Sequence, residues 1–246
     1  MIVLPIFLQM VLEYDAMQAG LSIAPLSLSM FAVALLMGRR AGAHRPAAVI
    51  RLGFALVAIG IAVLIPIVPD VDSGWYLLGP LLVVGSGLGL LVSQLNNYTL
   101  SPISEERVSE AAGVNSAAGS FGLSFGLAFA GAIMLATLSF VFTDMAQSSA
   151  VLSPAEQDHV AHVLDTDAEV MSNTHLAGLL EGQPKDVQAE IIRINTDARP
   201  KALQVALLVP LLAALLGLFD AFRMMRQPDP APANPEASGG EGSLLG

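Results

Sequence analysis

Cysteine is absent from this 246-residue sequence. The chain therefore has no disulfide framework, no thiol nucleophile and no thiolate metal site. Charged residues are also scarce, because Asp, Glu, Lys and Arg make up 13% of the chain, whereas soluble domains contain about 25%. Hydrophobic residues make up 54%, and the mean hydropathy is +0.66. Water-facing surface is therefore limited, and we expect lipid to surround most of the chain.

Motifs for nucleotide binding and catalysis are missing too. Gly85, Gly87 and Gly89 are closely spaced, but they follow no strand and no Lys-Ser/Thr pair comes after them. No set of Ser, His and acidic residues has a spacing that indicates catalysis. No acid lies at the middle of an apolar segment, where a proton-coupled pump would need a titrating group. We expect no enzyme activity, no cofactor and no nucleic-acid partner.

Long uncharged segments are the main feature that is present. Residues 74–104 and 111–143 form two of them, joined by a charged patch at residues 105–110. Each is longer than the roughly 20 residues that a helix needs to cross about 30 Å of hydrocarbon. This length favours membrane spans over the alternative that these helices fill a large soluble core.

Four further apolar segments complete the pattern: residues 2–12, 16–38, 52–69 and 202–219. The first is too short for a full crossing, so we expect it to be the later part of a helix that begins further upstream. The sequence therefore predicts an all-α, polytopic helical membrane protein. We expect about six transmembrane helices, five of them full spans and the first one partial.

The turns between these segments alternate in charge. Arg39 and Arg40 lie in a basic turn, whereas residues 13–15 and 70–72 are acidic. Because Lys and Arg are enriched in short cytoplasmic loops, we expect the basic turn and residues 105–110 to be cytoplasmic. The prediction is a multi-pass protein of the cell inner (plasma) membrane, with both termini cytoplasmic and an outer loop at residues 144–199.

The outer loop and the tail have their own sequence signals. Ser153 to Glu156 has the pattern of a capping box and predicts a helix through about Leu164. Residues 184–194 predict a second helix, on the membrane surface. His159 and His162 could hold a metal, although a solvated helix face is the ordinary alternative. We expect one helical bundle over residues 1–226 and a disordered cytoplasmic tail at residues 227–246, which are rich in Pro, Gly and Ala.

Small and polar residues inside the spans are candidates for packing and for a solute pathway. Small residues let membrane helices approach closely, and the predicted packing positions are Gly85, Gly89, Gly113, Gly122 and Gly126. Polar groups at membrane depth normally face the bundle interior or a water-filled path, and the candidates are Gln9, Gln94, Asn96, Asn97 and Asn115. Asn96 and Asn97 could equally be interfacial or capping residues, and Gln9 could form an interhelical hydrogen bond instead.

The order of several short motifs resembles that of a known family. These motifs are residues 4–9, Ala19-Gly20-Leu21 with Pro25, Gly38-Arg39-Arg40, residues 85–89, and Glu110 to Ser116 before a glycine-studded helix. Together they resemble the C-terminal half of a major facilitator superfamily transporter, and they are most similar to its fourteen-span drug:proton antiporter branch. The resemblance covers roughly residues 4–226.

This resemblance implies export of small amphipathic solutes or drugs by alternating access, proton-coupled in the complete protein. It implies that Gln9 lines the central cavity, that Gly38, Arg39 and Arg40 form the inner loop, and that Gly113 and Asn115 occupy family positions. The inner loop departs from the family pattern, because it lacks the usual acidic residue. Substrate binds between two halves in this architecture, so the implied partner is an N-terminal half. The alternatives are a non-transporting scaffold or remnant protein and a metal-binding loop sensor.

Overall fold

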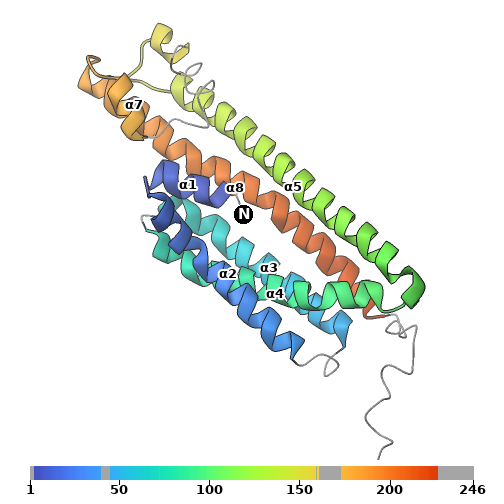
Figure 1. Cartoon of the computed structure of the whole chain (residues 1–246). Coiled ribbons are helices and arrows are strands. Elements are labelled where there is room, and N and C mark those ends of the chain that lie inside the picture. The colour runs from blue at the N-terminus through green and yellow to red at the C-terminus, as the bar shows by residue number, and fades with distance from the viewer. Residues whose placement is uncertain (1–2, 40–44, 72, 159, 161–172, 227–246) are drawn as a thin grey trace, which may run out of the picture. The chain divides into compact units, whose positions relative to one another are not determined.

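The computed structural model describes residues 3–39, 45–71, 73–158, 160 and 173–226, and it is helical with no strand among them (Figure 1). This confirms the predicted all-α class. The long helices are α2 (Ala16–Gly38), α3 (Pro46–Ile67), α4 (Leu78–Leu100), α5 (Glu105–Gln147) and α8 (Lys185–Met224). The short ones are α1 (Val3–Val11) and α7 (Asn173–Leu179), with 3-10 turns at Val68–Asp70 and Gly74–Leu77.

Five helices in the described residues are long and apolar enough to cross a membrane, and they are α2, α3, α4, α5 and α8. The first helix, α1, has 9 residues. The described part of the chain thus matches the predicted five full spans with a shorter helix before them. The predicted tail, residues 227–246, lies outside the described residues.

Two of the helices are much longer than a bilayer is thick. α5 has 43 residues and α8 has 40, which correspond to about 64 Å and 60 Å at 1.5 Å per residue. Each therefore extends well beyond the roughly 30 Å of hydrocarbon. The charged residues of α8 lie before Ala202, apart from those after Phe219, so the uncharged part of α8 coincides with the predicted last span at residues 202–219. The helix predicted to begin near residue 184 does begin at Lys185, but the expectation that it is separate from the last span is wrong, because α8 is continuous to Met224.

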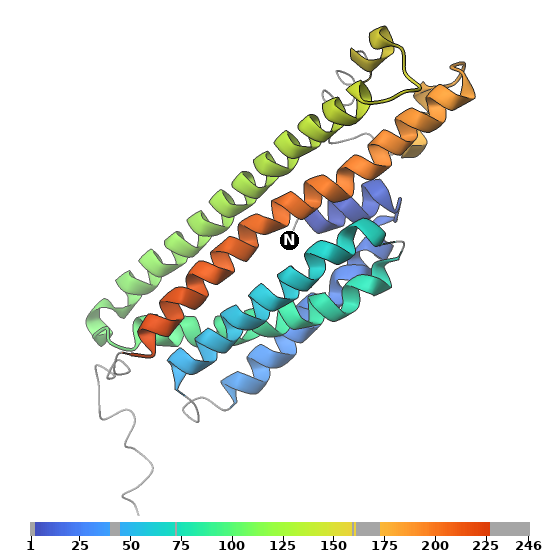
Figure 2. The same ribbon diagram turned by 180° about the vertical axis from the view of Figure 1, so that it is seen from behind.

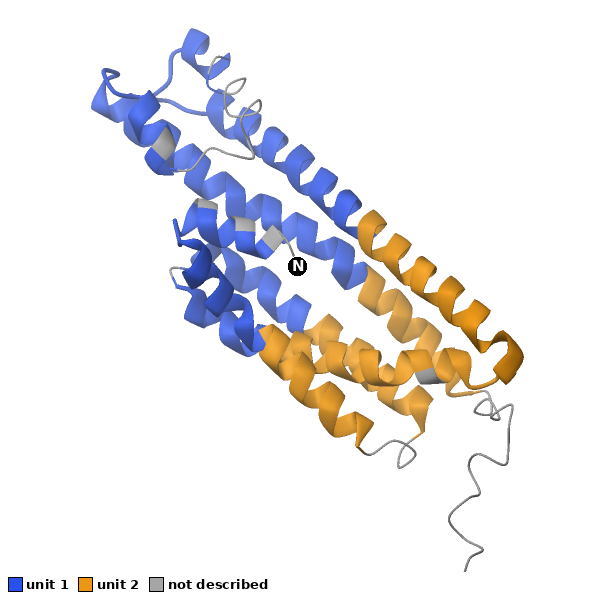
Figure 3. Cartoon of the chain, viewed as in Figure 1, with its two compact units in different colours: residues 1–25, 60–81, 126–212 blue, residues 26–59, 82–125, 213–246 orange. Residues whose placement is uncertain are grey.

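The chain forms two compact units (Figure 3). Unit 1 comprises residues 1–25, 60–81 and 126–212, and unit 2 comprises residues 26–59, 82–125 and 213–246. In unit 1, the end of α5 packs against the beginning of α8, as both views of the ribbon show (Figures 1 and 2). Their shared core contains Leu138, Phe142, Ala146, Leu152, Val160, Leu176, Val187, Ile191, Ile194, Ala198 and Ala202.

Unit 2 is held together by close helix contacts at glycines of α4. Gly85 lies against Leu26 and Ser29 of α2. Gly87 lies against α3, where a Cβ on Gly87 would be 2.6 Å from the carbonyl oxygen of Gly53. Only glycine permits such an approach, because any side chain would collide with the backbone of the neighbouring helix.

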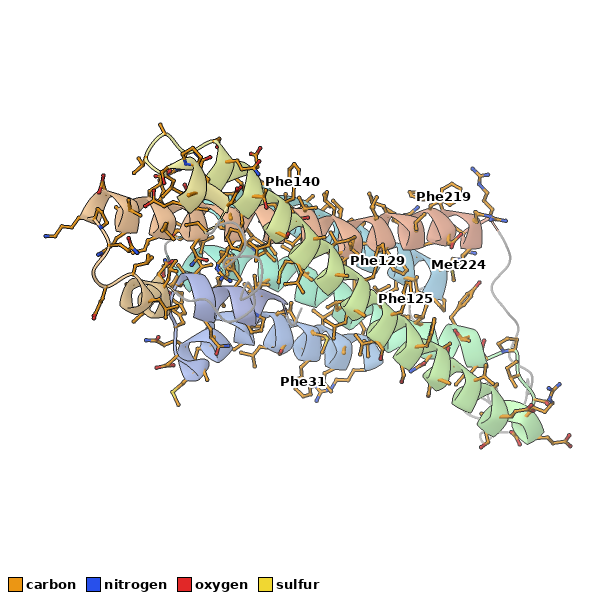
Figure 4. The ribbon with its side chains drawn as sticks, turned by 90° about the horizontal axis from the view of Figure 1, so that it is seen from above. Phe31, Phe125, Phe129, Phe140, Phe219 and Met224 are labelled. Atoms are coloured by element: carbon orange, nitrogen blue, oxygen red, sulfur yellow. The ribbon has the colours of Figure 1, made fainter. Side chains whose placement is uncertain are left out.

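Large apolar side chains remain exposed on several helices. Phe31 of α2, Phe140 of α5 and Phe219 of α8 are each more than 60% exposed, and they project from their helices (Figure 4). Within the most apolar windows of α2 and α5, only 6% and 11% of the residues are buried. Apolar faces of this extent are unusual on soluble monomers, and they are the faces that lipid covers in a membrane protein.

Candidate functional site

Four of the five predicted pathway candidates, all except Asn96, are divided between the two units. Gln9 lies in unit 1 and is exposed, and its amide nitrogen donates to the carbonyl oxygen of Pro5 at 3.2 Å, within its own helix. Gln94, Asn97 and Asn115 belong to unit 2. Gln94 is buried on α4, and Asn97 is in the same helix, but its side chain lies outside the described structure. The structure therefore describes Gln9 separately from the other three, and their common pathway stays a prediction.

Asn115 makes an interhelical hydrogen bond. Its amide nitrogen donates to the side-chain oxygen of Asn96 at 2.8 Å, which connects α5 to α4 across 19 positions of sequence. Such amide pairs hold neighbouring membrane helices together, typically by about 0.6 kcal/mol each. Each amide also has hydrogen-bonding capacity left over, so this pair can fix the two helices and still contact a solute.

An open pocket of about 650 Å³ lies beside this pair, entirely within unit 2. It is formed by the end of α4, the connection at residues 101–104 and the first turns of α5. Its lining residues are Thr99, Pro102, Ile103, Ser104, Arg107, Glu110, Ala111, Val114, Asn115 and Ala118. The volume falls in the range of about 300 to 1,000 Å³ that is common for small-molecule sites.

The lining of this pocket is chemically mixed. Ile103, Ala111 and Val114 provide apolar surface, and Asn115 supplies an amide next to it. Arg107 and Glu110 form an exposed ion pair at 3.4 Å, which contributes little to stability because water screens it. A wall on which polar and apolar side chains lie next to each other suits a solute that is itself amphipathic.

The predicted inner loop is partly described. Gly38 is the last residue of α2, and the backbone N–H of Arg39 continues the helical pattern by donating to the carbonyl oxygen of Leu35 at 3.1 Å. Both residues are exposed. Arg40 lies outside the described residues, so the role of these three residues in coupling stays a prediction.

The predicted packing glycines differ in their surroundings. Gly85 and Gly89 lie against α2, and a Cβ on Gly89 would be 2.6 Å from the carbonyl oxygen of Met30. A Cβ on Gly113, Gly122 or Gly126 would meet nothing within 4 Å. The helix contact expected for these three residues therefore stays a prediction, although Gly122 and Gly126 have the same spacing as Gly85 and Gly89.

No metal site is present in the part of the chain that the structure describes, since no three His, Cys, Asp or Glu side chains come close enough together there. His159 and His162, the candidate ligands in the outer loop, lie outside that part. The helix expected from Ser153 does begin there, because the Glu156 carboxylate accepts hydrogen bonds from both the backbone and the hydroxyl group of Ser153. These two hydrogen bonds lower the pKa of Glu156.

One polar residue within a span was missed by the sequence analysis. The side-chain amide of Gln204 in α8 donates to the carbonyl oxygen of Ile65 in α3 at 2.8 Å, within unit 1. In a continuous helix this carbonyl would accept from the N–H of residue 69, but residue 69 is a proline and has none. The signal was available, because a proline four residues after an apolar position predicts an orphaned carbonyl that lipid cannot satisfy.

A buried polar cluster in the first half of α8 was also missed. Arg199 is only 9% exposed, and its guanidinium donates to the side-chain oxygen of Asn195 at 3.2 Å. Asn195 in turn donates to the side-chain oxygen of Asn173 in α7 at 2.8 Å. A small cavity of about 20 Å³ adjoins Arg199. The predicted helix ended at residue 194, although Asn195 and Arg199 stand four apart on the face that carries Ile191 and Ala198.

Comparisons with known proteins agree with the helical, membrane-spanning architecture. The family model described as Major Facilitator Superfamily matches residues 1–127. The chain is 24% identical over 140 residues to a probable actinorhodin transporter of Streptomyces coelicolor, a match that covers 56% of this chain and 24% of that protein. It is 26% identical over 174 residues to the multidrug resistance protein Stp of Mycobacterium tuberculosis, covering 71% of this chain and 32% of that protein. No solved structure matches significantly. The matches thus span 24% and 32% of the length of these two relatives.

Proposed function

Because this chain belongs to the Major Facilitator Superfamily, we propose that it is part of a membrane transporter that exports small amphipathic solutes. The observation that carries this proposal is the family match across the first four helices, together with five helices that are apolar enough to cross a bilayer. The relatives are named for transport of an antibiotic and for multidrug resistance. Export of drug-like solutes is therefore the activity that we assign to this chain.

The pocket in unit 2 supports a solute of this kind. Its volume of about 650 Å³ is large enough for a drug-sized molecule, and its wall combines apolar residues with the Asn115 amide. Asn115 is held in place by Asn96, so its remaining hydrogen-bonding groups are preorganised for a ligand. We assign Asn115 to the solute pathway, and we retain Gln9, Gln94 and Asn97 as further pathway candidates.

The transport cycle that we propose is alternating access between two repeat-related halves. In transporters of this kind the substrate binds near the midplane, at the interface of the two halves. This chain would supply one half, and a complementary N-terminal transporter half would supply the other and the proton-coupling acids. The assembly would lie in the cell inner membrane, with both termini of this chain cytoplasmic. Its partners are the bilayer and the small-molecule substrate, and we assign it no enzyme activity.

The test is an export assay in a host that lacks its own drug pumps. Immunoblotting first establishes that the chain is in the membrane. Efflux of a fluorescent lipophilic cation is then measured with this chain alone and with a co-expressed N-terminal transporter half from its genomic neighbourhood. We expect export by the pair. Stable insertion of both proteins without any export would contradict the proposal and favour a scaffold or a remnant.

Three variants separate a pathway role of Asn115 from a structural one. Asn115→Leu removes the pocket amide and the interhelical hydrogen bond together, whereas Asn96→Leu removes the same bond from outside the pocket lining. Ser116→Leu is the control, because it makes a polar-to-apolar change next to Asn115 without lining the pocket. We expect Asn115→Leu to raise KM for the cation about tenfold, as loss of a hydrogen bond worth about 1 kcal/mol or more allows, with smaller effects from the other two. Equal effects of Asn115→Leu and Asn96→Leu would make the pair structural.

A further inference from the structure

Three consecutive residues between α1 and α2 each bind a different element of unit 1. Glu13, Tyr14 and Asp15 form an acidic turn, and its charge is the only feature of it that stands out in the sequence. In the structure this turn contacts the connection between α3 and α4, the start of α2, and the helix α7, which lies far along the chain. The turn therefore contacts three separate parts of unit 1.

Two of these contacts fix the turn itself. The hydroxyl oxygen of Tyr14 accepts a hydrogen bond from the backbone N–H of Gly74 at 3.0 Å, which lowers the pKa of Tyr14. The Asp15 carboxylate accepts from the N–H of Gln18 at 2.7 Å, and the Gln18 side-chain oxygen accepts from the N–H of Asp15 at 3.1 Å. This reciprocal pair is a capping box at the start of α2. The turn is thereby held to α2 and to the connection that precedes α4.

The third contact reaches across 161 positions of sequence. One carboxylate oxygen of Glu13 accepts from the backbone N–H of Thr174 at 2.8 Å, and the other accepts from the Thr174 hydroxyl at 2.7 Å. Thr174 is in the first turn of α7, where backbone N–H groups have no partner within the helix. Glu13 therefore caps a helix that belongs to the segment between α5 and α8.

α7 is in turn fixed to α8 and to the core of unit 1. Asn173 accepts from Asn195 at 2.8 Å and donates to the hydroxyl oxygen of Thr196 at 2.9 Å. Leu176 is 3% exposed and packs in the cluster shared by α5 and α8. We call the described residues between these two helices, 148–158, 160 and 173–184, the cap. Its last part is joined to α8 by both polar and apolar contacts.

We propose that the Glu13–Thr174 contact is a latch, which holds the cap and α8 against the turn between α1 and α2. The latch must open before the end of α8 next to the cap can separate from this turn. The contact is suited to reversible use. Both of its hydrogen bonds are exposed, so water can replace them at little cost. The contacts of α7 with α8, by comparison, are buried or partly buried, so the latch is the part that yields first.

The first test asks whether the latch holds α7 in place, and it needs no transport. Because the chain has no cysteine, Leu176→Cys introduces a single thiol, which is buried on α7. The rate at which a maleimide labels this thiol in membranes reports how often α7 separates from the core of unit 1. We expect Glu13→Ala and Thr174→Val, each combined with Leu176→Cys, to raise this rate about five- to tenfold.

The control is Glu156→Ala in the same Leu176→Cys background. Glu156 also accepts from a hydroxyl group and a backbone N–H at a helix start, but both belong to Ser153, three residues away. Its removal disturbs the cap locally and leaves the long-range contact intact. Labelling rates that are equal for Glu13→Ala and Glu156→Ala would overturn the latch, as would rates unchanged from the Leu176→Cys parent.

The second test concerns transport and rests on the proposed function. Glu13→Cys with Thr174→Cys is joined by a short bis-methanethiosulfonate reagent in an assembly that exports before treatment. We expect cross-linking to block export and reduction to restore it, with no effect of the reagent on either single cysteine variant. Cross-linked protein that still exports would overturn the gating role while the proposed function stands. An assembly that never exports would contradict the proposed function, and the labelling test would still show whether the Glu13–Thr174 contact holds α7 in place.

Discussion

The close approach of α4 to α3 in unit 2 allows a sharp prediction for Gly87→Ala. A Cβ on Gly87 would lie 2.6 Å from the carbonyl oxygen of Gly53 and 2.8 Å and 2.9 Å from Cγ2 and the backbone nitrogen of Val57. Two of these three atoms belong to the backbone, so a rotamer change cannot relieve the contact. The added methyl group must push the two helices apart.

The magnitude follows from two opposing effects. Overpacking a close contact costs about 1 to 3 kcal/mol, and replacing glycine by alanine inside a helix gains roughly 0.5 to 1 kcal/mol. We therefore expect Gly87→Ala to lower the stability of unit 2 by up to about 2.5 kcal/mol, with a central value of about 1.3 kcal/mol. Gly122→Ala is the matched control in α5, because its Cβ would meet nothing within 4 Å. It should be neutral or stabilising by up to about 1 kcal/mol.

A single introduced thiol measures the difference. Val57 is 8% exposed on α3 and lies against Gly87, so the thiol of a Val57→Cys variant is labelled by a maleimide only when this interface opens. In mild detergent we expect Gly87→Ala to speed labelling of this thiol about tenfold, since each factor of ten corresponds to about 1.4 kcal/mol. Gly122→Ala should leave the rate unchanged or slow it. The reasoning is refuted if the two variants label at the same rate, or if Gly87→Ala slows labelling.

Two further predictions concern unit 1. Gln204→Leu leaves the Ile65 carbonyl without the amide that donates to it at 2.8 Å, so we expect the free energy of unfolding, measured by thermal denaturation, to fall by about 1 to 3 kcal/mol. Val205→Leu, at the exposed neighbouring position, should leave the free energy of unfolding unchanged. Glu190 accepts hydrogen bonds from Arg193 and Ser149, and mainly the Arg193 bond lowers its pKa from 4.5 to about 2. Because the pKa is depressed in the folded state, this carboxylate stabilises the fold above pH 4.5, and the stabilisation is lost as the pH falls toward about 2. The melting temperatures of wild type and Glu190→Gln should therefore converge over that range, and a constant difference would contradict the assignment.

Local sequence was sufficient to predict the class of protein and the number of its spans. Hydropathy over about 20 residues decides whether a helix lies in lipid, and this property needs no knowledge of neighbours. The same holds for the capping box at Ser153, whose partners are three residues apart. The helix start near residue 184 was also predicted correctly, because α8 begins at Lys185. The separation of this helix from the last span was predicted wrongly, for a local reason. Charged residues near Ala202 suggested a break, but Lys and Arg are good helix formers, and α8 continues through them.

Contacts between distant segments were decided by the tertiary structure. Gly85 and Gly89 have the same spacing as Gly122 and Gly126, yet only the first pair lies against another helix in the described residues. A periodic pattern identifies a face of a helix, but it does not identify what covers that face.

The same limit explains the two most informative polar contacts. From the sequence alone, Glu13 is expected to be a solvated acid, but in the structure it accepts hydrogen bonds from Thr174 of α7. Gln204 is expected to be an isolated polar residue, but it donates to the Ile65 carbonyl of α3, which cannot accept from Pro69. Composition and periodicity determined that this chain is a bundle of membrane helices, because lipid acts on each helix separately. Only the packing of those helices decided which polar groups meet, because a hydrogen bond requires two atoms within about 3 Å and these lie 139 and 161 positions apart in the chain.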